Sequence, residues 1–132
     1  MLGDLVYEAK GKVTGERVLQ VDPPKLESSY NLASTLKGMK VSEMGTYTST
    51  MRPDGTMLGE DKAIIMAEDG SVTTATAQGI GRFTGPEKIT FRGFATVGAG
   101  GTGSLGAVNS LVIAVEVEVD GGNLTIKGWE WK

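Results

Sequence analysis

Residues 57–83 read MLGEDKAIIMAEDGSVTTATAQGIGRF, and this stretch decides the expected fold. Apolar and polar residues alternate on both sides of Asp69-Gly70, with the period of two that is typical of β-strands. An Asp-Gly pair favours a tight hairpin, because glycine adopts positive φ angles without steric cost. The stretch therefore predicts two antiparallel strands, at 56–68 and 71–84, joined by a short turn.

The same pattern continues along the chain in both directions. Turn signals such as DPPK, LKGM, RPDGT, FTGPEK, GAGGTG and VDGGN separate the alternating stretches. Antiparallel strands joined in sequence order favour an up-and-down β-barrel, because closure removes the exposed sheet edges. No repeat or boundary interrupts the chain, so we expect one all-β domain over residues 1–132, an eight-stranded antiparallel barrel. Its strands are predicted at 5–21, 25–36, 39–52, 56–68, 71–84, 87–98, 105–119 and 123–131.

The composition excludes several kinds of chemistry. The chain has no cysteine and no histidine, which removes disulfides, thiolate catalysis, zinc–sulfur sites and the usual general base. The net charge is −3 without a basic stripe, so we do not expect a nucleic-acid partner. The N-terminal MLGDLVYEAK lacks the apolar run of a signal peptide, and no stretch is apolar enough to span a membrane. We expect a cytoplasmic protein without a membrane partner, metal or cofactor.

Turn lengths fix the strand register, and the register decides which alternate residues face the interior. Two-residue loops at Asp54-Gly55, Asp69-Gly70 and Gly85-Pro86 predict a largely apolar inner face. Its residues include Ala63, Ile65, Phe91, Ala95 and Val97, and the outer face includes Glu43 and Tyr47. In strand 25–36, a two- or three-residue loop at LKGM decides whether Tyr30 or Glu27 points inward, and we favour Tyr30. The polar residues predicted inside are Arg17, Asp61, Gln78, Arg82, Asn109, Glu130 and the threonines Thr46, Thr48, Thr74 and Thr76.

The last hairpin places Glu130 inside and its two tryptophan neighbours outside. A four-residue loop at 120–123 pairs Glu116 with Lys127 on the outer face and Ile113 with Glu130 on the inner face. Closure sets the first strand beside the last, so Arg17 and Glu130 are expected to meet inside. The outward aromatic residues predict apolar patches of the kind that mark oligomer contacts, unless Lys127 and the chain ends cover the rings. We expect a dimer or larger homo-oligomer, with these aromatics outside: Trp129, Trp131, Phe83, Phe94 and Tyr47.

The predicted interior polar residues allow two interpretations. They form a satisfied network that locks the register, or a polar floor that orients a small ligand in an apolar cavity. The small interior residues favour some free space: Gly59, Ala63, Gly93, Ala95 and Gly128. The expected ligand-binding residues are Arg17, Gln78, Arg82, Asn109, Glu130, Asp61 and Tyr30.

Three functions follow from these interpretations. The first is binding of a small, largely apolar molecule in the lumen. The second is an isomerase or cyclase acting on a small hydrophobic substrate, with Glu130 or Asp61 as the acid or base and Arg17 or Arg82 stabilising charge. The third is a structural or assembly module with a filled barrel.

Four segments carry a resemblance to known proteins: GKVTGERVLQV (11–21), GTYTSTMRPDGTMLGE (45–60), QGIGRFTGPEKITFRG (78–93) and the closing EVEVD with WEWK. The chain resembles a family of small, uncharacterised bacterial and archaeal proteins, similar in pattern to the allene-oxide-cyclase-like and lipocalin-like β-barrels. The resemblance implies an eight-stranded barrel, dimeric or larger, with no assigned activity. Asp61 in GEDKAI departs from the family pattern, which has small or amide residues there, so the resemblance does not support it as a shared functional group.

Overall fold

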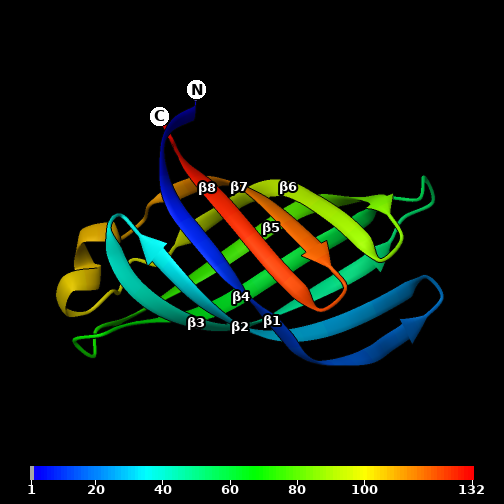
Figure 1. The fold of residues 1–132 in the computed structure, drawn as a ribbon, viewed down its shortest axis with the longest axis horizontal. Helices are drawn as coiled ribbons and strands as arrows, with labels where there is room; N and C mark the ends of the chain where they lie inside the picture. Colours follow the sequence, from blue (N-terminus) through cyan, green and yellow to red (C-terminus); the bar gives the residue numbers. More distant parts are fainter. Residues whose placement is uncertain (1) are drawn as a thin grey trace.

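The computed structural model describes residues 2–132, which form a closed barrel of eight antiparallel strands in sequence order (Figure 1). The predicted up-and-down barrel is confirmed, and β1 closes the sheet by pairing with β8. The strands are β1 (Leu2–Val21), β2 (Pro24–Leu36), β3 (Met39–Met51), β4 (Met57–Ala67), β5 (Val72–Gly85), β6 (Lys88–Val97), β7 (Val112–Asp120) and β8 (Asn123–Trp131).

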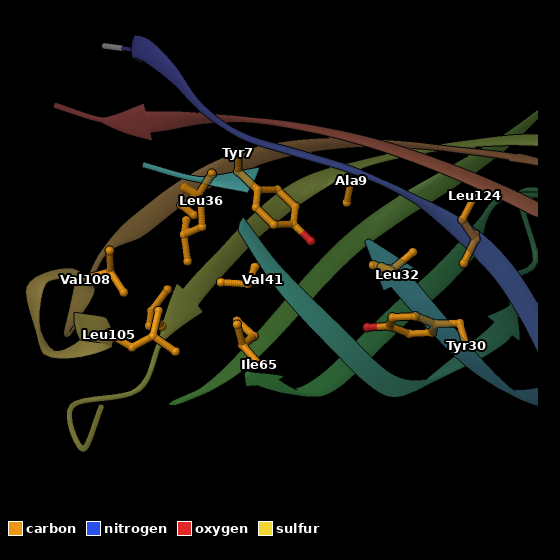
Figure 2. Close-up of a cluster of buried hydrophobic side chains, with 12 residues drawn as sticks. Tyr7, Ala9, Tyr30, Leu32, Leu36, Val41, Ile65, Leu105, Val108 and Leu124 are labelled. Atoms are coloured by element: carbon orange, nitrogen blue, oxygen red, sulfur yellow. The ribbon is translucent and has the colours of Figure 1, made fainter. Parts of the chain in front are cut away.

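The strand predicted at 105–119 was wrong over its first residues, which form a plug. Residues Gly103–Val108 are a 3₁₀-helix, η1, at one end of the barrel (Figure 1). Leu105 and Val108 lie three residues apart and so share one face of this helix, and they are only 0% and 2% exposed. Figure 2 shows both packed at one end of the buried cluster that includes Leu36, Val41 and Ile65. In residues 2–132, no helix has the length and apolar character needed to cross a bilayer.

One predicted register, that of β7 and β8, and the favoured inward orientation of Tyr30 are confirmed. In the β7–β8 hairpin, Glu116 is paired with Lys127 and Ile113 with Glu130, as the four-residue loop predicts. The β2–β3 connection is a two-residue turn at Lys37-Gly38, because Leu36 pairs with Met39. Tyr30 consequently points inward, and it is buried.

The predicted registers of β3 and β5 relative to β4 were wrong by one residue. Arg52 donates its N–H to Thr56 O at 2.8 Å, so the loop holds the three residues 53–55 rather than two. Gly55 ends it with φ 84°, the left-handed position of the glycine in a three-residue hairpin. The β4–β5 loop is built in the same way, with Ala67 bonded to Ser71 and Gly70 at φ 86°.

This difference reverses which alternate residues face the interior on two strands. β3 turns Glu43 and Tyr47 inward, and β5 turns Thr73 and Ala75 inward. The threonines predicted inside, Thr46, Thr48, Thr74 and Thr76, lie on the outer face, together with Gln78 and Arg82. The predicted inner residues of β4 and β6 are correct: Asp61, Ala63, Ile65, Phe91, Ala95 and Val97 border the interior.

Candidate functional site

The barrel encloses a cavity of about 120 Å³ with a mainly apolar wall. Small inward residues on β4, β5 and β6 leave this space, and they include Gly59, Ala63, Ala75, Gly93 and Ala95. Four of these five residues were among those predicted to leave free space inside. The cavity reaches from the aliphatic side chains beside η1, such as Leu36, toward the part of the lumen lined by Phe91.

The first polar feature of the lumen is a buried pair formed by Tyr7 and Glu43. Tyr7 projects from β1 and donates its hydroxyl to Glu43 Oε2 on β3, at 2.7 Å. Glu43 is only 7% exposed, and burial raises the pKa of its carboxyl to about 7. The bond from Tyr7 opposes this shift, while the nearby Asp61 carboxylate adds to it. Burial, with the negative charge of Glu43, also raises the pKa of the Tyr7 hydroxyl. The Tyr7 hydroxyl points into the interior in Figure 2.

A second pair, Tyr30 and Asp61, spans β2 and β4. The Tyr30 hydroxyl donates to Asp61 Oδ1 at 2.7 Å, although Tyr30 faces Gly45 on the intervening strand β3. The ring passes over this glycine, where a Cβ atom would lie 2.4 Å from Tyr30 Oη. Burial raises the pKa of Asp61 to about 6, against the lowering effect of the bond from Tyr30. Gly45 therefore makes the second pair sterically possible.

Aromatic rings lie beside the second pair. The Tyr47 ring centroid is 6.0 Å from that of Tyr30 and 6.4 Å from that of Phe91, the latter in an edge-on arrangement. Tyr47 is also the cross-strand neighbour of Asp61. The Phe91 ring occupies the space over two glycines, because a Cβ at Gly59 or Gly81 would approach it within 3.0 Å. One side of the cavity thus combines aromatic faces with a carboxyl group.

The charges around the cavity are one-sided. Among residues 2–132, no lysine or arginine borders the cavity, whereas three acids do: Glu43 and Asp61, and the exposed Glu60 at its edge. The described ion pairs lie elsewhere and do not include any of the three carboxyls. No group of three or more acidic side chains within this described range is arranged to hold a metal ion. The site is an apolar chamber with one buried acid, Glu43, one half-buried acid, Asp61, and three tyrosines.

Several of the predicted site residues lie outside this chamber. Arg17 is 71% exposed and pairs with Glu27 at 3.2 Å. Arg82 is exposed, and Asn109 is an exposed residue that accepts the Gly101 N–H at 2.9 Å beside η1. Gln78 is exposed and borders both the cavity and a groove on the outer face. Only Tyr30 and Asp61 of the predicted set form part of the buried polar site.

The expected contact between Arg17 and Glu130 was wrong for two reasons. A register shift between Val13 and Gly15 interrupts the alternation of β1, and β1 pairs with β8 only as far as Lys12. Arg17 therefore lies on the part of β1 that runs past β8. Glu130 sits on the inner face as predicted, but Lys37 is its partner at 3.1 Å.

The residues that the sequence analysis missed are Tyr7, Glu43 and Tyr47. The last two were assigned to the outer face because Asp54-Gly55 was interpreted as a two-residue loop. Pro53 was the signal for the longer loop, since proline favours the second position of a type I turn. In Arg52-Pro53-Asp54-Gly55, that turn puts the glycine in the left-handed position and shifts the register by one residue.

Comparison with solved structures supports the fold. The chain is similar to a protein of unknown function from Clostridium acetobutylicum ATCC 824, with a TM-score of 0.80, 14% identity and 96% of each chain covered. It is also similar to a conserved protein of unknown function from Rhodopseudomonas palustris, with a TM-score of 0.76, 12% identity, and 98% of this chain and 99% of the other covered. No protein-family model and no curated protein matches the chain. The implied likeness to uncharacterised bacterial barrel proteins is confirmed at the level of the fold.

Proposed function

We propose that the protein binds a small, largely apolar molecule inside the barrel. The observation that carries this proposal is the cavity of about 120 Å³, whose apolar wall is interrupted by the Tyr7–Glu43 and Tyr30–Asp61 pairs. Binding pockets commonly combine such walls with a few polar groups that orient the ligand. A dry apolar cavity of roughly 150 Å³ is known to hold benzene, so a ligand with about one ring matches the available space.

The test is a titration of the labelled protein with a one-ring probe, benzyl alcohol, followed by two-dimensional ¹H–¹⁵N NMR. Binding in the lumen is expected to shift backbone signals of inward residues such as Ala63 and Ala75. Ala95→Leu fills the cavity and is expected to abolish these shifts. Ala33→Leu is the matched control, because Ala33 is exposed on the outer face of β2. Shifts that persist unchanged in Ala95→Leu contradict binding in the lumen.

A second candidate function is catalysis of the isomerase or cyclase type. The observation that favours it is Glu43, whose pKa of about 7 lets the carboxyl accept or donate a proton near neutral pH. The Tyr7 hydroxyl at 2.7 Å holds that carboxyl in place. Under this alternative, Glu43→Gln abolishes turnover of a small hydrophobic substrate while the substrate still binds. A filled barrel that serves only in assembly is the third alternative, and it predicts no ligand in the native mass spectrum of freshly purified protein.

We also propose that the protein is a cytoplasmic homo-oligomer that associates through the outer face of β6, β7, β8 and β1. Phe94, Ala114, Trp129 and Leu5 are successive cross-strand neighbours on this face. Trp131 beside them is 60% exposed, and Phe94 is exposed as well. Such a contiguous apolar surface is typical of a contact with a second copy. Trp131→Lys is expected to lower the molar mass measured by light scattering. A wild-type protein with the molar mass of a monomer refutes the proposal, and a variant with the same mass as an oligomeric wild type refutes the role of this face.

A further inference from the structure

We propose that the molecule bound in the lumen is a small organic cation, an amine carried on a one-ring apolar body. This inference rests on the proposed function, because it assigns a chemical class to the ligand of the same cavity. The inference rests on three observations. Two inward-facing acids border the cavity, no described lining residue carries a positive charge, and aromatic rings adjoin the acids.

The two lumen acids have no cationic partner in the described part of the chain. Glu43 and Asp61 each accept a hydrogen bond from a tyrosine, and none of the described ion pairs includes them. A tyrosine hydroxyl supplies one proton to a carboxylate that has several acceptor sites. Burying a carboxylate without an opposite charge is unfavourable, so an ammonium group in the cavity supplies the missing partner.

The two acids lie on neighbouring strands and border the same cavity. On β3 and β4, Glu43 pairs with Ile65, Gly45 pairs with Ala63, and Tyr47 pairs with Asp61. The Tyr30 ring covers Gly45, so Ala63 is the small residue that leaves room in the cavity between the acids. A ligand in the cavity lies beside both carboxyl groups, because Glu43 and Asp61 both border it.

A buried hydroxyl lies beside the Tyr7–Glu43 pair. Ser34 Oγ makes no hydrogen bond within the described residues. Ser34 lies on the inner face of β2 between Leu32 and Leu36, near enough to the Tyr7 hydroxyl to lower its pKa but outside hydrogen-bonding geometry. Ser34 is not one of the residues that line the cavity, so the polar contacts of a ligand come from the Tyr7–Glu43 and Tyr30–Asp61 pairs.

The aromatic residues suit the same ligand class. Tyr47 and Tyr30 present rings beside Asp61, and a cation over such a ring gains an attraction that strengthens when water is excluded. A neutral ring fits the apolar wall but leaves the acids without a counter-charge. An anionic ligand faces two carboxyl groups with no cation beside it, and is disfavoured.

The proposal predicts a characteristic dependence on pH. The titratable groups that face the two acids are Tyr7 from β1, Tyr30 from β2, Tyr47 from β3 and the acids themselves. Burial keeps both acids protonated in the empty barrel at low pH, so an ammonium ion meets neutral groups there. Raising the pH ionises the acids and strengthens cation binding, whereas the binding of a neutral ring changes little.

The experiment compares three one-ring probes of nearly equal size: benzylamine, benzyl alcohol and benzoate. Dissociation constants are measured by NMR titration at pH 8 and pH 5. At pH 8, benzylamine is expected to bind at least about tenfold more tightly than benzyl alcohol, with no measurable binding of benzoate. At pH 5, the preference for benzylamine is expected to disappear. Benzyl alcohol or benzoate binding as tightly as benzylamine at pH 8 overturns the cation proposal while leaving binding in the lumen intact. If no probe shifts the lumen signals, the proposed function fails as well.

Two variants without a carboxyl charge distinguish the effect of the acids on affinity from a loss of affinity caused by impaired folding. Glu43→Gln and Asp61→Asn are each expected to lower the affinity for benzylamine severalfold at pH 8 without changing that for benzyl alcohol. Glu118→Gln is the matched control, because Glu118 is exposed on the outer face of β7. If Glu43→Gln does not fold, Asp61→Asn alone decides. Benzylamine affinity that stays at the wild-type level in every folded variant refutes the role of the acids.

Discussion

Replacing Glu43 with glutamine is expected to flatten the dependence of stability on pH. The folded state holds the Glu43 pKa at about 7, above the ordinary value of 4.5, because the carboxyl is buried. Below pH 4.5 the carboxyl is protonated in both the folded and the unfolded chain, so its ionisation does not reduce the free energy of unfolding there. As the pH rises toward 7, the unfolded chain ionises freely while the folded protein does not, and stability is lost. Glutamine cannot ionise, yet its amide oxygen still accepts the bond from Tyr7.

The size of the effect follows from the two pKa values. A difference between 4.5 and about 7 corresponds to roughly 3 kcal/mol of the free energy of unfolding, at about 1.4 kcal/mol per pH unit. Part of this is already lost below pH 5, so between pH 5 and pH 8 the wild type is expected to lose roughly 2.5 kcal/mol through Glu43. It loses a further part through Asp61, whose pKa is about 6.

The assay is urea denaturation, followed by circular dichroism at pH 5, 6, 7 and 8. The quantity compared is the change in unfolding free energy across this range, because glutamine also alters the absolute stability by burying an amide. Glu118→Gln, on the outer face, is expected to keep the wild-type slope. A Glu43→Gln protein whose stability falls as steeply as that of the wild type would show that Glu43 ionises as easily inside the barrel as in water.

Three other substitutions test the construction of the site. Gly45→Ala is expected to destabilise the protein by about 1–3 kcal/mol in urea denaturation, because its Cβ would lie 2.4 Å from Tyr30 Oη and 2.8 Å from a backbone oxygen. Gly15→Ala, with no atom within 4 Å of the added Cβ, serves as its control, and equal effects of the two refute the steric role of Gly45. Leu105→Ala is expected to lower the unfolding free energy by about 2–5 kcal/mol, because Leu105 is fully buried; a loss below about 1 kcal/mol in the same assay contradicts its role as a plug. Tyr30→Phe removes the bond that lowers the Asp61 pKa, so that pKa is expected to rise above 6 in a ¹³C NMR titration, and an unchanged value contradicts the pairing.

The barrel was predictable because its signals are local. Alternation marks each strand, and a glycine or proline marks each turn, so strand order and number follow without knowledge of the interior. The β7–β8 pairing was also predictable, since its loop length and the pairing of Glu116 with Lys127 lead to the same register.

The candidate site was less predictable because it depends on whether each turn holds an even or odd number of residues. One additional residue in the loop around Asp54 moved Glu43 and Tyr47 from the outer face to the lumen. An equal change around Asp69 moved Gln78 outward, and the next hairpin restored the expected faces, so Phe91 was placed correctly.

Two other features depend on contacts between distant residues. The register shift near Gly15 in β1 carries no clear signal in the local sequence, yet it changes the faces of the residues that follow, including Arg17. The helix η1 is short, and its apolar residues are buried by strands far away in the sequence. Alternation alone therefore extended β7 backward over Leu105.

The two tyrosine bonds have a mechanical consequence. Each bond joins two strands that are not adjacent, β1 to β3 and β2 to β4. Together the two bonds connect the four strands β1–β4, which form one half of the barrel wall, the braced half. On the opposite half, β5 contributes small inner residues such as Ala75, Ala77 and Gly79, which span no such distance. We expect the braced half to keep its curvature when a larger ligand binds. The other half is expected to deform, with β5 and β6 bending outward.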